Sequence, residues 1–209
     1  MSEIIANGLR ADAAPRDSAE RRAFDQDAVE HLIRQLLTAI GEDPDRDGLK
    51  DTPRRVAAWW AQFLTPDPGV LDTVFDHDDV GDQWVAVSDI EIWTICEHHL
   101  LPFRLSLTIG YIPAGRVIGL SKIARIALRH AAGLQLQERL TAQIAQTLAS
   151  LTGSPDVGVW ATGEHLCMSM RGVRATRART RTGCLLGRLR TEPGLGDRLL
   201  AATEQRRHG

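Results

Sequence analysis

The alternation of hydrophobic and polar residues divides the first third of the chain into helical stretches. Residues 28–40 carry apolar side chains at helical spacing, and Gly41 ends the run. Thr52 is expected to be a helix N-cap with Pro53 in the first helical position. Because proline breaks helices, this second helix is expected to end before Pro66.

The hydrophobic period changes from helical to extended after Trp84. Residues 85–95 are rich in β-branched side chains, which predicts either a pair of strands or one bulged strand that arrives at Cys96. A second strand is expected over residues 105–112. It closes at residues 113–115, whose Pro-Ala-Gly sequence is consistent with a hairpin turn.

The second half of the chain repeats the order of two helices and two strands. Ser121 is expected to cap a helix that Gly133 ends, and a longer amphipathic helix follows it. The last elements are expected at residues 157–168 (a strand), 177–188 (its antiparallel partner) and 197–205 (a helix). This order predicts an α+β fold with antiparallel strands and helices packed on one face.

The organisation predicted from these elements is a single domain over residues 28–209, whose first part, residues 28–64, is a helical arm. Residues 1–27 are rich in Ala and Asp, are broken by Pro15 and lack a signal-peptide core, so they are interpreted as a disordered tail.

Composition restricts the class of partner. A net charge of -2 argues against nucleic acid or an anionic membrane as the main partner, and no apolar run approaches the length of a membrane span. Three cysteines without an export signal favour a cytoplasmic protein whose thiols are available for a metal rather than for disulfides.

Cysteine and histidine residues cluster at two places in the chain. The Cys-x-x-His pair follows a predicted strand, and the second pair is two residues apart on another, so each pair can face one centre. The five candidate ligands are Cys96, His98, His99, His165 and Cys167. Three protein ligands with an open position for water form a catalytic zinc arrangement, and thiolates favour zinc over magnesium or calcium. The alternative is that a lone Cys-x-x-His is incidental and that a buried cysteine merely packs, which is the role expected for Cys184.

Several longer motifs occur in a fixed order along the chain. They are Cys96–Phe103, Tyr111–Pro113, Val117–Arg125, Gln137–Thr141 and Glu164–Val173, preceded by Gly41–Pro44 and Asp51–Val56. Together they closely resemble the GTP cyclohydrolase I family, and the resemblance runs from about Ala28 to the end of the chain.

The resemblance implies a tunnelling fold, in which each subunit has a four-stranded antiparallel sheet with two long helices on one face. Oligomerisation closes these sheets into a barrel, typically a homodecamer with active sites at subunit interfaces. The implied reaction is zinc-dependent hydrolysis of GTP to 7,8-dihydroneopterin triphosphate and formate, through water attack at guanine C8, ring opening, ribose rearrangement and ring closure. That reaction is the first step of tetrahydrofolate, pterin-type or deazapurine biosynthesis.

The resemblance also implies a role for each candidate residue. Cys96, His99 and Cys167 would hold the zinc ion, while His98 and His165 would act as acid and base. The alternative for His98 is a fourth zinc ligand or a group that orients one.

Substrate contacts are implied in the same way. Glu138 would anchor the guanine, and Gln137 would line the same pocket, although the two side chains point about 100° apart on a helix. The alternative for Glu138 is a surface ion pair with Arg139 or Arg34. The residues expected to grip the triphosphate are Ser121, Lys122, Arg125 and Arg171, with Arg55 supplied by a neighbouring subunit. Any one of these arginines could instead be a solvated surface charge.

Three departures from the family pattern concern the rim of the pocket rather than the residues expected to bind the metal or the guanine. The chain has Arg104–Ser106 where the family often has a glycine, Gly133 where it often has an arginine, and an arginine-rich segment at residues 175–184.

The competing interpretations of the function are a binding-only relative of the same fold, a nucleic-acid-binding module stabilised by zinc, and a nitrile-reducing relative. The ligand set together with both histidines favours the enzyme.

Overall fold

The computed structural model describes residues 23–65, 67, 69–76 and 83–204, and it divides into two compact units, Met1–Ala58 and Trp59–Gly209. In the first unit, helix α1 (Gln26–Ala39) begins two residues before the predicted start, and the Asp25 side chain caps it by accepting from the Ala28 N–H. Helix α2 (Thr52–Leu64) begins one residue before the predicted start, so Thr52 is its first residue rather than its N-cap. Most of the predicted tail lies outside the described residues.

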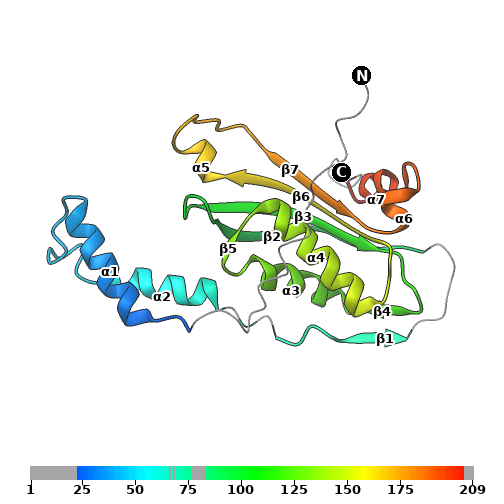
Figure 1. Cartoon of the computed structure of the whole chain (residues 1–209), viewed down its shortest axis with the longest axis horizontal. Helices are drawn as coiled ribbons and strands as arrows, with labels where there is room; N and C mark the ends of the chain where they lie inside the picture. Colours follow the sequence, from blue (N-terminus) through cyan, green and yellow to red (C-terminus); the bar gives the residue numbers. More distant parts are fainter. Residues whose placement is uncertain (1–22, 66, 68, 77–82, 205–209) are drawn as a thin grey trace, which may run out of the picture. The chain divides into compact units, whose positions relative to one another are not determined.

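A twisted five-stranded sheet forms the centre of the second unit (Figure 1). Its order is β5 (Leu134–Gln135), β2 (Val85–Cys96), β3 (Pro102–Tyr111), β6 (Val157–His165) and β7 (Thr180–Leu185). The last four strands are antiparallel neighbours, as expected. The prediction of four strands is wrong by one, because the short β5 pairs in parallel with the end of β2.

Strand β2 settles the choice that the sequence left open between two strands and one bulged strand. It is a single strand whose register against β3 shifts between Val87 and Ile90, and Asp89 there has a φ of 56°. Such a bulge adds a residue on one strand and bends it locally. Beyond the bulge the strand continues to Cys96, which is its last residue.

The turn at residues 113–115 does not form the predicted hairpin. The strand that follows it, β4 (Arg116–Ile118), pairs with β1 (Val74–Asp76) in a separate two-stranded sheet rather than with β3. This pairing brings together segments about 40 residues apart, which local periodicity cannot reveal.

Helices α3 (Leu120–Ala131) and α4 (Gln137–Thr152) cover one face of the large sheet, where they contact β2, β6 and β7 (Figure 1). Alternate side chains of β3, from Phe103 to Tyr111, point to this face and are fully buried. Ser121 does not cap α3 as predicted, because the helix begins one residue earlier and Gly119 is its N-cap.

Three short helices lie at the two ends of the last strand pair. Strand β6 ends at His165, earlier than predicted, and the chain turns into α5 (Leu166–Ser169). At the other end of β7, α6 (Arg188–Thr191) and α7 (Leu195–Glu204) build a second small core around Ile112, Leu189 and Leu199. Among the described residues, no helix has both the length and the apolar character to cross a membrane.

Candidate metal centre and active site

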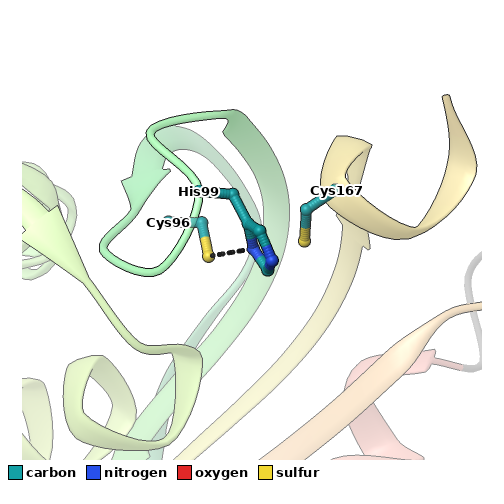
Figure 2. A group of neighbouring side chains, drawn as sticks. All are labelled: Cys96, His99 and Cys167. Atoms are coloured by element: carbon teal, nitrogen blue, oxygen red, sulfur yellow. Dashed lines mark hydrogen bonds between the residues drawn. The ribbon is translucent and has the colours of Figure 1, made fainter. Parts of the chain in front are cut away.

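Three of the five candidate ligands converge at one end of the sheet (Figure 2). Cys96 is the last residue of β2, and His99 lies in the tight turn that leads to β3. Cys167 comes from α5, directly after the adjacent end of β6. The ligand atoms of these three residues all lie within 4.8 Å of one another.

The spacing of this Cys₂His group fits a tetrahedral zinc ion. Cys96 Sγ lies 3.6 Å from His99 Nδ1. Zinc–sulfur and zinc–nitrogen bonds of ordinary length at a tetrahedral angle separate the two donors by about 3.6 Å. The third thiol is close enough to join with a small side-chain adjustment. Three protein donors leave one tetrahedral position open, which is the arrangement of catalytic rather than structural zinc sites.

The surroundings of Cys167 favour its protonated thiol. Burial raises the pKa of Cys167 above its ordinary value, the neighbouring Cys96 raises it further, and the Arg171 guanidinium opposes both effects. Two adjacent thiolates repel each other unless a cation lies between them. A bound divalent ion reverses this balance, because it favours the deprotonated form of each thiol that coordinates it.

His165 lies next to this group but outside it. Its ring stacks on Phe103, with 4.3 Å between ring centroids and 10° between planes, and its Nε2 lies 2.8 Å from Gln137 Oε1. Burial lowers the pKa of His165, and the Glu138 carboxylate partly offsets this by raising it. The ring is therefore held in a defined position in an environment that favours its neutral form.

His98 is exposed and directly precedes His99 in the turn between β2 and β3. Its ring makes an edge contact with His99 at 6.1 Å between centroids. It does not belong to the convergent group of three. Its proposed acid/base role stays a prediction.

Gln137 and Glu138 begin α4 and face different environments. Gln137 is 1% exposed, whereas Glu138 is exposed on the side from which its charge reaches His165. The two ion-pair partners considered for Glu138 are engaged elsewhere, because Arg139 pairs with Glu97 and Arg34 pairs with an aspartate of its own unit. The Glu138 carboxylate is thus available to a ligand beside His165.

The residues expected to grip the phosphates occupy the start of α3. Ser121 is exposed there, and Lys122 Nζ donates to the Val70 carbonyl at 2.8 Å. Arg125 lies against the same loop, since a Cβ added at Gly69 would come within 2.3 Å of its guanidinium. These three side chains form one group.

This phosphate-binding group is remote from the metal group within one chain. The last turn of α3 adjoins the metal end of the sheet, where the Ala131 carbonyl accepts from Thr94, two residues before Cys96. The first turn follows Ile118, whose N–H donates to Tyr111 at the far end of β3. A 12-residue helix spans about 18 Å, so the two groups lie at opposite ends of α3.

The other two predicted phosphate ligands have different positions. Arg171 follows α5 and is exposed, and its charge acts on the Cys167 thiol, so it belongs to the metal side. Arg55 lies on α2 in the first unit and forms an exposed ion pair with Asp51 at 3.4 Å.

Two contacts that support the site were not predicted from the sequence. Phe103 stacks on His165 because the two residues are register partners on β3 and β6. Arg139 binds Glu97 at 2.5 Å and thereby ties the metal-bearing turn to α4. Strand register could have suggested the first contact, since Phe103 lies near the start of β3 and His165 ends β6, but the second depends on tertiary packing alone.

The fold and the site define an α+β protein with a Cys₂His metal group and a histidine and carboxylate beside it. The family model of GTP cyclohydrolase I matches residues 29–204. The chain belongs to the GTP cyclohydrolase I family.

Curated relatives match over most of their length. A protein of Mycobacterium ulcerans named GTP cyclohydrolase 1 is 47% identical over 182 residues, which cover 84% of this chain and 89% of the relative. A protein of Streptomyces griseus with the same name is 48% identical over 176 residues, covering 80% and 86%.

Among solved structures, the apo form of the archaeosine synthase QueF-Like is similar over 50% of this chain and 93% of that chain. The TM-score is 0.41 and the sequence identity 14%. A similarity of this size carries no conclusion about function.

Proposed function

We propose that this chain hydrolyses GTP to 7,8-dihydroneopterin triphosphate and formate, the first step of folate or pterin biosynthesis. The observation that carries the proposal is the convergence of Cys96, His99 and Cys167 beside His165 and Glu138 in a chain of this family. A binding-only relative would not require an open metal position beside acid/base groups.

The metal that suits this site is zinc. Two thiolates and one imidazole form a soft donor set that favours zinc over magnesium or calcium. A zinc ion held there supplies Lewis acidity and lowers the pKa of a coordinated water toward neutrality. The thiols of Cys96 and Cys167 and the ring of His99 are the groups that would hold it.

The remaining residues orient the base and move protons. Glu138 is exposed beside His165, and its carboxylate can accept from the guanine ring N–H and the exocyclic amino group. His165 stacks on Phe103, and His98 lies next to His99 in the turn, so one could accept a proton from the attacking water while the other donates to the purine nitrogen as the ring opens. Both exchanges need a neutral imidazole and its cation to interconvert near neutral pH.

The triphosphate would be bound by a second copy of the chain. Ser121 and Lys122 are about a helix length away from the end of α3 that adjoins the metal group of their own chain, and Arg125 is about half that length away. Among the described residues expected to bind phosphate, Arg171 lies on the metal side. An active site at a subunit interface would bring both groups together. Arg55 is proposed to reach the phosphates of the same site from a neighbouring subunit.

The exposed edges of the large sheet support such an assembly. Strand β7 is an edge strand of six residues, and β5 at the other edge has only two. Edge strands leave backbone N–H and C=O groups free to pair with another chain. A barrel closed by several copies, as in the tunnelling fold and typically a homodecamer, would satisfy them. A cytoplasmic location remains part of the proposal.

The proposal is tested by incubating the zinc-loaded protein with GTP and measuring formate together with the fluorescent pterin obtained after oxidation. Equal amounts of both are expected. Cys96→Ser should abolish metal binding and activity together, and His98→Ala should lower kcat by about 10²- to 10⁴-fold. Cys184→Ser, which changes a thiol outside the metal group, is the matched control and should retain both products.

Two results would contradict the proposal. Formate without pterin would mean that the ring opens but the ribose does not rearrange. Neither product, from an oligomer with bound zinc, would favour the binding-only relative.

A further inference from the structure

The side-chain amide of Gln137 is enclosed at the start of α4, and the protein itself satisfies it. Its Nε2 donates to the Thr180 carbonyl at 3.1 Å and to Thr182 Oγ1 at 3.2 Å, and the Ala161 carbonyl lies at 3.4 Å. Its Oε1 lies 2.8 Å from His165 Nε2. An amide in such surroundings has no free N–H to offer to a ligand.

The hydrogen-bond partners determine which way this amide points. Backbone carbonyls only accept, so the NH₂ group must face Thr180 and Ala161. The reverse orientation would set the amide oxygen against two carbonyl oxygens. The oxygen of Gln137 therefore faces His165, and an oxygen that only accepts requires a hydrogen on His165 Nε2.

We propose that Gln137 is a positioning residue, which holds His165 as the tautomer with hydrogen on Nε2 and leaves Nδ1 to exchange protons with the substrate. Phe103 stacks on the face of the ring, so the ring plane and the tautomer are both defined. Among the described residues, Nδ1 makes no hydrogen bond. The role in proton exchange rests on the proposed function, whereas the tautomer does not.

Gly163 makes room for this arrangement. It lies two residues before His165 on β6, on the same face of the sheet. A Cβ at this position would lie 2.3 Å from Gln137 Oε1 and 2.7 Å from Leu105 Cδ2. A larger residue at 163 must therefore displace the oxygen that faces His165.

This role differs from a direct guanine contact by Gln137. To reach a base, the buried amide would have to give up its bonds to Thr180 and Thr182, and each lost bond leaves a buried polar group unsatisfied. The neighbouring Glu138 is exposed, and its carboxylate makes no such bonds to any residue that the structure describes. The base therefore meets Glu138, and Gln137 acts through His165.

The tautomer is measured by solid-state NMR of zinc-loaded protein labelled with ¹³C and ¹⁵N in histidine. The chain has seven histidines, and a His165→Phe variant identifies the signals of interest by subtraction. Wild type should show the Nε2–H tautomer for His165, and Gln137→Met should give a mixture. Thr152→Val, which loses a buried hydrogen bond at the other end of α4, is the control and should keep the wild-type signals. The Nδ1–H tautomer in wild type, or an unchanged spectrum in Gln137→Met, would overturn the assignment.

Kinetics separate positioning from substrate binding. Gln137→Met should lower kcat by about 10- to 100-fold and leave the KM for GTP near its wild-type value. Adding Gln137→Met to His165→Ala should cause no further loss, because the glutamine acts only through the histidine. A raised KM, or losses that multiply in the double variant, would mean that Gln137 contacts the substrate and would refute the proposal.

A second variant covers the case in which Gln137→Met does not fold. Gly163→Ala keeps the amide and shifts its oxygen, so the same mixture of tautomers and the same fall in kcat are expected. Wild-type kinetics and spectra in Gly163→Ala would count against the proposal. If the wild-type protein forms no product from GTP, the proposed function fails, but the NMR result still decides the tautomer.

Discussion

Adjacent residues at the start of α4 show how the tertiary structure divides roles between neighbours. The helical period separates Gln137 and Glu138 by about 100°, so the sequence already indicates that they face different surroundings. It does not indicate which of them is buried. Contact of α4 with β6 and β7 decides this, because it encloses Gln137 and leaves Glu138 exposed.

Tyr111 provides a test of burial at the scale of one residue. It is the single tyrosine of the chain, it is fully buried, and its hydroxyl accepts from the Ile118 N–H at 3.0 Å. Burial raises the pKa of Tyr111, and this hydrogen bond lowers it by a smaller amount. Below a pH of about 10 the folded and unfolded chains both keep the proton. Above it the unfolded chain ionises first, so the free energy of unfolding should fall as pH rises.

Tyrosinate absorbance at 295 nm measures this directly. It should appear only as the far-UV circular dichroism is lost, and Tyr111→Phe should show no such signal. Ionisation near pH 10 in a chain that keeps its dichroism would contradict the prediction.

At the scale of elements, the turn between β2 and β3 depends on α4 for its position. The Cys96 N–H donates to the Leu101 carbonyl at 2.9 Å, which closes the turn. Arg139 on α4 then donates to Glu97 inside the turn at 2.5 Å and to the Leu134 carbonyl of β5 at 3.1 Å. One side chain thus joins the metal-bearing turn, the short edge strand and the helix that carries Glu138.

Removal of the Arg139–Glu97 ion pair should weaken zinc binding more than it lowers the stability of the fold. Both side chains of the pair are about a third exposed, so Arg139→Met should cost about 1 kcal/mol or less in stability. Zinc affinity should fall by about 10-fold, because an outer contact no longer orients the turn. Competition with a chelator measures the affinity, and Arg129→Met, an exposed arginine on α3, is the control. Equal zinc affinity in both variants would show that the turn holds its shape without Arg139.

At the scale of the whole molecule, the proposed function divides the active site into two parts. The metal group lies near one end of α3, whereas Ser121 and Lys122 of the proposed phosphate-binding group lie at the other, about 18 Å along the helix. Flexibility of one side chain cannot close that distance, since an extended lysine reaches about 6 Å. Two copies that place the end of one sheet against the start of a neighbouring α3 would complete the site.

Mixed oligomers test this arrangement. Cys167→Ser removes a metal ligand, and Lys122→Met removes an ammonium from the phosphate-binding group, so each variant alone should be nearly inactive. Subunits of the two variants, dissociated and reassembled in equal amounts, should recover about a quarter of wild-type activity, because random mixing completes that share of shared sites. Mixtures that reassemble to the wild-type size and stay inactive would refute a shared site.

The sequence by itself determined the periodic elements, and its resemblance to the family indicated the Cys96, His99 and Cys167 group that the structure brings together. Apolar spacing defined α1, α4 and most of β2 and β3, because side-chain burial follows the period of each element. The spacing of cysteines and histidines left five candidate ligands, and the resemblance to the family reduced them to three. Cys167 is one of the three, although it lies on a short helix rather than on the predicted strand.

Only the tertiary structure decided how the elements pair and which polar groups are satisfied. The pairing of β1 with β4, the parallel edge strand β5 and the bond from Gln137 to His165 join residues that are far apart in the chain. Local periodicity contains no information about such contacts, because their partners and their geometry arise from packing. The same holds for the separation of Ser121 from Cys96, which follows from the direction in which α3 crosses the sheet.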